Sequence, residues 1–338
     1  MTEFRLHGAN PEKTYRSFSI PVPDKIYDFS TNTNVLPWNG KFEIDIQKTL
    51  SEYPDDESLE LCHLIAEQNH CSLENVLVTN GSNEAIYLIS SYQTAKRNCI
   101  LQPAYGEYMR ALKAFDASVV NAMSLSDIKT TDETVWICNP CNPTGAFLED
   151  KVLIPLLKKF DNNIFIIDEA YRDFMYDNNS NLKVKDFSNL IIMRSLTKSY
   201  HLCGSRIGYV MSSPELIKNL KRRQPTWSVN SIAQQAAVKF MQDKEFLKKT
   251  REYYRTEVPR LIKELKNLGF EINPTSVNYF LLKTSDDEKL IRFLLTRGIV
   301  VRHTRNFLGL DGKYVRIAAR SIDENDILIN AMKEYESN

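Results

Sequence analysis

The sequence predicts an α/β protein, with a mostly parallel sheet covered by helices and a smaller α+β unit after it. Short apolar runs alternate with amphipathic stretches through the middle of the chain, as in βαβ units. After about residue 250 this alternation ends, and a long charged amphipathic stretch leads to further strand-like runs. The change in pattern predicts a large first domain and a smaller second one.

Five buried strands are expected in the large domain, because each run is apolar and turn-forming residues bound it. They are Val76–Thr79, Cys99–Leu101, Thr134–Cys138, Ile164–Asp168 and Leu190–Arg194. The amphipathic stretch Asp150–Lys159 predicts a helix between two of them. Ligands bind beyond the carboxyl ends of such strands, so the residues that follow each strand are candidates for a site.

The smaller unit is expected to begin with a helix from about Phe246 to Leu268, followed by Gly269. Strands are then expected at Val277–Leu282, Gly298–Arg302 and Tyr314–Ala318, with a closing helix at Asp323–Glu336. We therefore divide the chain into an N-terminal segment (1–40), a large domain (41–250) and a small C-terminal domain (251–338).

The composition excludes several functional classes. The 338 residues are 43% hydrophobic and 25% charged, as in ordinary globular proteins. Lys and Arg together number 43, as do Asp and Glu, so there is no net basic charge to attract nucleic acid or an anionic membrane. No apolar run approaches the length of about 20 residues that a membrane span requires, and the start lacks a signal-peptide pattern. We expect a cytoplasmic protein with no nucleic-acid or membrane partner.

The six cysteines are too sparse for a disulfide framework. Cys138 and Cys141 have the C-x-x-C spacing of redox and zinc sites, but no second ligand pair accompanies them. We predict that these cysteines pack as small apolar residues and that the protein holds no metal.

The run from Ser195 to Gly208 contains the most informative motif. Lys198 stands among hydroxyl residues, and Arg206 follows eight positions later. Lysine forms a Schiff base with an aldehyde cofactor, and the groups of Ser195 and Arg206 are suited to hold that cofactor's phosphate. A surface loop with a chance lysine would have the same pattern, so the motif gains weight only from the other strand ends.

Three of the other strands are followed by segments with a possible role in binding. Asn80–Ala85 opens a helix, whose first N–H groups suit an anion, although an ordinary capped helix would look the same. Tyr105 is placed either to stack on a flat ring or to join the core. The two Asn-Pro pairs of Asn139–Gly145 predict a rigid turn that presents the amide of Asn142 to a ring oxygen.

Asp168 ends a predicted buried strand, where an unpaired carboxylate is costly. A protonated pyridine nitrogen would compensate it and would turn a cofactor ring into an electron sink. The alternative is an ordinary aspartate that caps a helix. Tyr171 follows three residues later, within reach of a ring hydroxyl.

Taken in chain order, these segments resemble the fold-type-I pyridoxal-phosphate enzymes of the class I/II aminotransferase superfamily. The motifs that carry the resemblance are Asn-Pro-x-Asn-Pro-Thr-Gly, Asp-Glu-Ala-Tyr, and Ser-x-Thr-Lys with an arginine eight positions on, and the similarity spans essentially the whole chain. The resemblance implies pyridoxal 5'-phosphate as the cofactor, held by the domain 41–250. It implies that Lys198 forms the Schiff base and that Asp168 pairs with the ring nitrogen.

The resemblance also assigns the remaining cofactor contacts. Asn142 and Tyr171 are implied to contact the ring oxygen and Tyr105 to stack on the ring. The phosphate is implied to lie against Ser195, Arg206 and the backbone of Ser82 and Asn83. The segment Ser51–Asp56 resembles the one whose tyrosine, here Tyr53, reaches the phosphate of the neighbouring subunit, which implies a homodimer.

Within that family the chain is similar to the group that contains histidinol-phosphate aminotransferase and threonine-phosphate decarboxylase. Three segments favour the decarboxylase, namely His7–Asn10, Asp28–Asn34 and Arg302–Arg320. The resemblance places a small phosphorylated amino acid against His7, Gly8, Asn32, Asn142, Arg302 and Arg316. We therefore expect a lyase that decarboxylates L-threonine O-3-phosphate or L-serine O-phosphate, with residues 1–40 contributing to the substrate site and the small domain.

Alternatives remain open at this stage. An aminotransferase of the histidinol-phosphate type would use similar arginines, and a ligand-binding homologue without activity is disfavoured by the presence of Lys198 and Asp168. Arg302 and Arg316 could instead be surface cations that flank two strands of the small domain, but their coincidence with the other motifs disfavours this alternative. Ala9 replaces the usual second glycine of the N-terminal motif, which leaves the choice between threonine phosphate and serine phosphate undecided.

Overall fold

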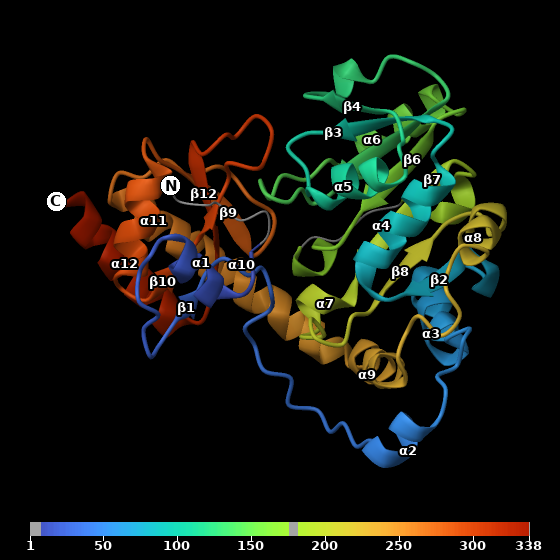
Figure 1. Ribbon diagram of the computed structural model, residues 1–338, viewed down its shortest axis with the longest axis horizontal. Coiled ribbons are helices and arrows are strands. Elements are labelled where there is room, and N and C mark those ends of the chain that lie inside the picture. The colour runs from blue at the N-terminus through green and yellow to red at the C-terminus, as the bar shows by residue number, and fades with distance from the viewer. Residues whose placement is uncertain (1–7, 176–181, 338) are drawn as a thin grey trace.

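The computed structural model describes residues 8–175 and 182–337 and has the expected α/β architecture (Figure 1). A seven-stranded sheet with the order β2-β8-β7-β6-β5-β3-β4 forms the centre of the large domain. Its strands are β2 Val76–Thr79, β3 Arg97–Leu101, β4 Val119–Ala122, β5 Glu133–Cys138, β6 Ile164–Asp168, β7 Leu190–Ser195 and β8 Gly208–Met211. The five strands expected from the sequence are therefore confirmed, within one or two residues at their ends.

Five of these strands, β3 to β7, run parallel to one another, which confirms a mostly parallel sheet. The strand β8 runs antiparallel between β2 and β7. Strand β8 was not predicted, since it begins at Gly208, where the lysine motif ends. Strand β4 was not predicted because it lies at the sheet edge and only its last residue is buried.

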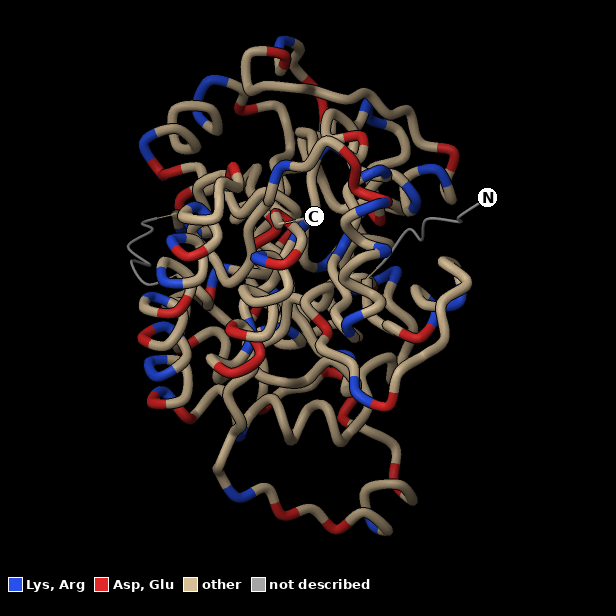
Figure 2. The backbone as a smooth tube through the Cα atoms, turned by 90° about the vertical axis from the view of Figure 1, so that its left-hand side faces the viewer, with Lys and Arg blue, Asp and Glu red and all other residues tan. Residues whose placement is uncertain are grey.

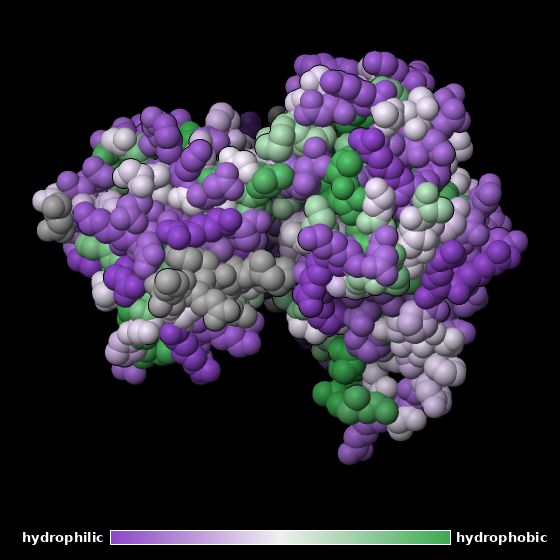
Figure 3. Space-filling view, turned by 45° about the horizontal axis from the view of Figure 1, so that its top comes forward, coloured by the Kyte–Doolittle hydropathy of each residue, from purple (hydrophilic) through white to green (hydrophobic). Residues whose placement is uncertain are grey.

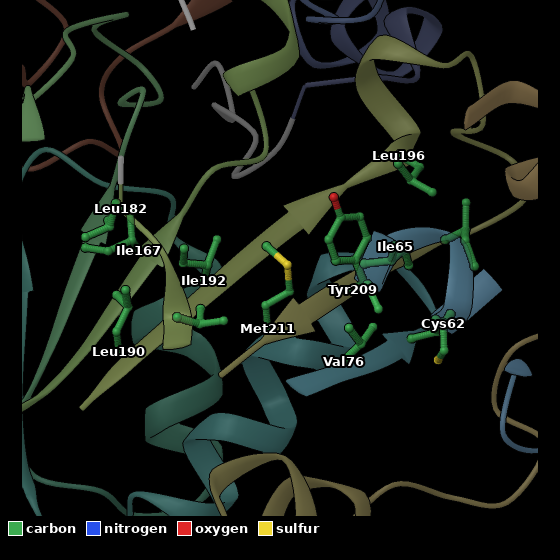
Figure 4. Close-up of a cluster of buried hydrophobic side chains, with 14 of the residues drawn as sticks. Cys62, Ile65, Val76, Ile167, Leu182, Leu190, Ile192, Leu196, Tyr209 and Met211 are labelled. Atoms are coloured by element: carbon green, nitrogen blue, oxygen red, sulfur yellow. The ribbon is translucent and has the colours of Figure 1, made fainter. Parts of the chain in front are cut away.

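Apolar side chains alternate between the two faces of the sheet, as the two-residue period of a strand requires. In β6, for example, Phe165 and Ile167 join one core cluster and Ile166 joins another on the opposite face. Figure 4 shows part of the first cluster, where Ile192 of β7 and Met211 of β8 point to the same side as Ile167. The helices that flank the sheet are α3 Leu59–Asn69, α4 Gly81–Tyr92, α5 Glu107–Ala114, α6 Asp150–Lys159, α8 Pro214–Lys221 and α9 Ser231–Gln242.

A single long helix joins the two domains. The helix α10 spans Lys244–Asn267, and its first residues contribute Phe246 to the large-domain core, whereas Tyr254 and Leu261 belong to the core of the small domain. The side chain of Asp243 caps this helix by accepting a hydrogen bond from the Phe246 N–H at 3.1 Å. Residue 250, where we divided the chain, therefore lies inside a helix.

The small domain contains an antiparallel sheet with the order β11-β12-β9. Its strands are β9 Tyr279–Lys283, β11 Arg302–His303 and β12 Tyr314–Ala318, and its helices are α11 Asp287–Leu295 and α12 Ile322–Glu336. The single strand expected at Gly298–Arg302 is wrong. The chain changes partners there, so β10 (Ile299–Val300) pairs with β1 (Tyr27–Asp28), whereas β11 pairs with β12.

The N-terminal segment packs on the small domain. Besides pairing through β1, it contains α1 (Pro11–Ser17) and buries Tyr15, Phe18 and Phe29 in the small-domain core. It then passes to the large domain through α2 (Ile46–Ser51), which projects from the body of the molecule (Figure 1).

Lys and Arg positions are interspersed with Asp and Glu positions along the described part of the chain (Figure 2). This distribution agrees with the formal net charge of zero. Of the helices in the described ranges, none is long and apolar enough to cross a membrane.

Candidate active site

A cavity of about 240 Å³ opens beyond the carboxyl ends of the parallel strands, where the large domain, the small domain and the N-terminal segment meet. Twelve of the residues predicted to form the site line it: Gly8, Asn32, Ser82, Asn83, Tyr105, Asn142, Asp168, Tyr171, Lys198, Arg206, Arg302 and Arg316. Two predicted residues, Ser195 and Tyr53, do not line it. His7 lies outside the described residues.

Lys198 enters the cavity from the short helix α7 (Leu196–Ser199), which directly follows β7. Its backbone carbonyl accepts a hydrogen bond of 2.9 Å from the N–H of Asn34, which ties this helix to the N-terminal segment. Desolvation lowers the pKa of the Lys198 ammonium, and the cations of Arg316 and Arg206 lower it further. The lowered pKa increases the fraction of neutral amine, which is the nucleophilic form.

Asp168 lies on the cavity floor at the end of β6 and is buried. One carboxylate oxygen, Oδ1, accepts a hydrogen bond of 2.9 Å from the Ala170 N–H, and the other, Oδ2, accepts one of 2.6 Å from the Tyr108 hydroxyl. Burial raises the pKa of Asp168, and these two hydrogen bonds oppose the rise. Asp168 caps no helix, because the N-cap of the short helix that follows is Tyr171.

The next residue, Glu169, has cationic partners that Asp168 lacks within the described ranges. Glu169 is also buried, but its carboxylate accepts hydrogen bonds from Arg172 at 2.9 Å and from Arg194 at 2.8 Å. Asp168 forms no ion pair with any residue in the described ranges. Since a buried carboxylate without a cation is costly, the cavity floor favours a cationic group of a ligand.

A second part of the cavity is suited to a phosphate. The helix α4 begins at Gly81, and Ser82 and Asn83 of its first turn line the cavity beside Arg206. A Cβ atom at Gly81 would lie 2.7 Å from Arg206 Nη2. A Cβ atom at Gly208 would lie 2.9 Å from the backbone nitrogen of Ser82. Gly81 thus lets the guanidinium approach the helix N-terminus, and Gly208 lets the start of β8 approach it. N–H groups and a positive charge at one place favour an anion.

Thr197 lines the cavity, whereas Ser195 does not. The hydroxyls of the two residues lie 2.7 Å apart, with Ser195 buried behind Thr197. The assignment of Ser195 to the phosphate stays a prediction, and the structure adds Thr197 as a candidate for the same role.

The opposite wall carries two arginines. Arg302 of β11 and Arg316 of β12 are direct partners across the antiparallel pair, and both are buried, with 4% and 5% of their surface exposed. They are therefore not surface cations. Arg302 donates a hydrogen bond of 2.7 Å to Asn306, and Arg316 donates to the side chain of Asn142 and to the carbonyl of Ser30. Like charges directly opposite each other in a sheet are destabilising, so an anionic ligand would stabilise this wall.

Two residues that line this end of the cavity each have a buried polar atom without a partner among the described residues. Asn32 donates a hydrogen bond of 3.3 Å to the Tyr171 hydroxyl. Its Oδ1 atom and the Nε atom of Arg316 are buried and have no hydrogen-bond partner within the described part of the chain. Buried polar groups are usually satisfied, so an acceptor and a donor left over at one cavity indicate a ligand that supplies their partners.

Tyr53 lies outside the cavity of its own chain. It is 79% exposed, and its ring packs against that of Trp227 with centroids 4.6 Å apart. The structure also brings in residues that sequence reasoning missed: Ala9, Ser30, Thr31, Gly106, Cys138, Ala170, Thr197, Asn306 and Phe307. Most of them stand within the quoted motifs, and their side chains could not be assigned to the cavity before the fold was known.

The residues present fit the cofactor that the motifs predict. Lys198 would supply the amine, Asp168 a carboxylate for a ring nitrogen, and Tyr105 an aromatic surface. The α4 N-terminus and Arg206 would supply a phosphate pocket. Four cationic side chains and one carboxylate line the cavity, so a further anion would be accommodated as well.

Comparisons with known proteins agree with this geometry. The sequence profile of the family described as "Aminotransferase class I and II" matches residues 26–332. The chain is 31% identical to a histidinol-phosphate aminotransferase of Thermoanaerobacter sp., with 95% of each chain covered. It is also 31% identical to the threonine-phosphate decarboxylase of Salmonella typhimurium, with 97% of this chain and 95% of the relative covered.

A solved structure extends the similarity to the fold. The L-threonine-O-3-phosphate decarboxylase of Porphyromonas gingivalis superimposes with a TM-score of 0.82 at 25% sequence identity. The alignment covers 93% of this chain and 100% of the other. Relatives with two different activities, an aminotransferase and a decarboxylase, are therefore similar to this chain.

Proposed function

Because the chain belongs to the class I and II aminotransferase family and its cofactor is pyridoxal 5'-phosphate, we propose that it decarboxylates an O-phospho-L-amino acid. The substrate is L-threonine O-3-phosphate or L-serine O-phosphate, and the product is the corresponding amino-alcohol phosphate. The reaction breaks the bond between Cα and the carboxylate, releases CO₂ and places a proton on Cα.

The observation that carries this proposal is the pair of buried arginines on adjacent strands. A phospho-amino acid bears a phosphate and a carboxylate, and the fork of an arginine suits either anion. Arg302 and Arg316 would bind one anion each, and this would relieve the repulsion between them. Histidinol phosphate bears a phosphate but no carboxylate, so it would use only one of the two.

The cofactor, when bound, supplies an electron-withdrawing ring. This ring stabilises the negative charge that remains on Cα when the bond perpendicular to the ring plane breaks. Lys198 would hold the cofactor through its neutral amine and would move a proton to Cα. Asp168 would keep the ring nitrogen protonated. By holding both anions of the substrate, Arg302 and Arg316 orient Cα, so binding energy from the phosphate helps select the bond that breaks.

An aminotransferase remains the second candidate. Its amino donor would carry carboxylates of its own, which the same two arginines would bind, and relatives with both activities resemble this chain at 31% identity. The two reactions differ in whether the Cα–H bond or the Cα–carboxylate bond breaks.

The deciding experiment uses the holoenzyme with phosphothreonine and phosphoserine, each with and without 2-oxoglutarate. We expect CO₂ release without the oxo-acid, and comparatively little from unphosphorylated threonine and serine. Transfer of the amino group to 2-oxoglutarate without CO₂ would establish the aminotransferase instead. Substrate binding with neither product would leave a ligand-binding homologue, and Lys198→Ala serves as the inactive control.

We also propose that the protein is a homodimer, with α2 and Tyr53 at the interface. Ile46, Leu50, Tyr53 and Trp227 are all between 48% and 79% exposed, and apolar residues gather on the part that projects from the lower right of Figure 3. Exposed apolar surface of this kind marks protein–protein contacts.

Complementation tests the dimer and the role of Tyr53 together. Mixed Lys198→Ala and Tyr53→Ala protomers contain one hybrid site with both residues intact, so we expect partial recovery of activity. No recovery in hybrids confirmed by mass spectrometry would remove Tyr53 from the partner's site.

A further inference from the structure

We propose that Tyr108, which does not line the cavity, is a positioning residue that holds the Asp168 carboxylate in place for the cationic ring nitrogen of the cofactor. The inference rests on the role proposed above for Asp168. It adds a residue that lies behind the site and acts only through its neighbour.

Tyr108 is held rigidly at this position. It stands on α5 and is fully buried, and its ring stacks on that of Trp136 with centroids 5.4 Å apart. Trp136 is fixed in turn by a hydrogen bond of 3.0 Å from its Nε1 to Asn98 Oδ1. The Tyr108 hydroxyl is therefore preorganised, and it donates to Asp168 Oδ2 at 2.6 Å.

The two donors to Asp168 differ in origin. The Ala170 N–H belongs to the backbone and comes with the turn after β6, whereas the Tyr108 hydroxyl is the side-chain donor to this carboxylate. Each carboxylate oxygen can accept two hydrogen bonds, so one donor to each oxygen orients the carboxylate and leaves acceptor capacity for a ligand. A short hydrogen bond to a charged acceptor is also stronger than one between neutral groups.

This hydrogen bond has an electrostatic consequence for the bound ring. Burial and the neighbouring Glu169 raise the pKa of Asp168, and the Tyr108 hydroxyl lowers it. A less basic carboxylate leaves the shared proton on the ring nitrogen rather than taking it. Without the hydroxyl, the proton would move more often from the ring nitrogen to Asp168, which leaves both groups neutral. A ring with a neutral nitrogen would withdraw electrons less effectively.

Tyr108 also contacts the residue expected to stack on the ring. Its ring meets that of Tyr105 edge to face, with centroids 5.9 Å apart and an interplanar angle of 89°. One buried side chain thus touches both the carboxylate for the ring nitrogen and the aromatic surface beside the ring. Tyr108→Phe separates the two contributions, because phenylalanine keeps the packing against Trp136 and Tyr105 and removes only the hydroxyl.

The test is a double-mutant cycle of Tyr108→Phe and Asp168→Asn, read by titrating each apoenzyme with pyridoxal 5'-phosphate. We expect Tyr108→Phe alone to weaken cofactor binding about 10-fold, the effect of losing a hydrogen bond to a charged group. In the Asp168→Asn background the same change is expected to cost less than about 2-fold, because the carboxylate it acts through is gone. The absorption spectrum of the bound cofactor should also titrate at a different pH in Tyr108→Phe.

Tyr254→Phe is the matched control. Tyr254 stands on α10, the helix that joins the domains, and is buried as well. Its hydroxyl accepts a hydrogen bond of 2.9 Å from the Val35 N–H. It should leave cofactor affinity unchanged, and thermal unfolding of each apoenzyme checks that the variants fold. Equal losses from Tyr108→Phe in both backgrounds, or no loss in either, would overturn the proposal. The titration is independent of whether the enzyme decarboxylates or transaminates, so failure here is distinct from failure of the proposed reaction.

Discussion

The two ends of the cavity are built on different principles. At the cofactor end, Asp168 ends β6, Lys198 follows β7 and Arg206 precedes β8, all in one sheet. The Asp168 carboxylate accepts a hydrogen bond from the Tyr108 hydroxyl, and the Arg206 guanidinium donates one to the Cys203 carbonyl. At the substrate end, Arg302 and Arg316 face each other across two short strands of the small domain, and Asn32 comes from the N-terminal segment.

The difference concerns where charge is compensated. The cofactor end has one carboxylate among its cations, and its geometry depends on a rigid sheet. The substrate end brings two buried guanidiniums together and leaves Asn32 Oδ1 and Arg316 Nε without partners in the described ranges. The first end is preorganised for one permanent ligand, whereas the second is completed only when an anionic ligand arrives.

Removing the amine breaks the cofactor end and should have the largest effect. Lys198→Ala is expected to lower kcat at least about a thousand-fold, or about 4 kcal/mol, because no other side chain supplies the nucleophile. Borohydride reduction followed by peptide mass spectrometry should label Lys198 in the wild type. Labelling of a different lysine would refute the assignment.

Breaking the substrate end should leave the cofactor end intact. Arg316→Gln is expected to lower kcat/KM for the phosphorylated substrate about 100-fold, since losing one partner of a buried charged contact costs roughly 2–5 kcal/mol. Cofactor affinity, measured by titration, should change less than about 3-fold. Arg305→Gln is the control, because Arg305 pairs with Asp287 and does not line the cavity. A similar loss of cofactor affinity and of kcat/KM in Arg316→Gln would show that the two ends are not separate.

The phosphate pocket allows a finer comparison between two neighbouring hydroxyls. Thr197→Val removes the hydroxyl of a residue that lines the cavity and should weaken cofactor binding about 10-fold. Ser195→Ala acts one layer behind and should cost less than about 3-fold. The measurement is again the cofactor titration. If Ser195→Ala had the larger effect, the hydroxyl predicted from the sequence motif would be the one that holds the phosphate.

The smallest effect is expected in the stability of the apoenzyme. The pKa of Asp168 is raised in the folded state, so its contribution to stability is present below the unfolded-state pKa and is lost as pH rises through the folded-state pKa. Asp168→Asn removes the buried charge, so its apoenzyme should melt a few degrees above the wild type at pH 7, with a smaller difference near pH 4. Thermal scans at both pH values check this. A variant less stable than the wild type at pH 7 would mean that other contacts of the carboxylate outweigh its desolvation.

Much of the cofactor end could be predicted from the sequence because its residues follow locally determined elements. A run such as Ile164–Asp168 reads as a buried strand by itself, and the residue that ends it must then lie at the carboxyl edge of the sheet. The same reasoning placed Asn142, Tyr105 and Lys198 at one edge. The sequence by itself therefore determined the fold class, the family and most of the predicted site residues that line the cavity.

Only the tertiary structure decided how distant segments pair and which side chains face the cavity. The split of β10 and β11 depends on β1, more than 270 residues away in the chain, and this split puts Arg302 opposite Arg316. The hydrogen bond from Tyr108 to Asp168 joins residues 60 positions apart. That Thr197 and not Ser195 lines the cavity was also visible only in the folded structure. Local patterns specify elements, but register, pairing and the direction of a side chain come from packing between segments that the sequence keeps far apart.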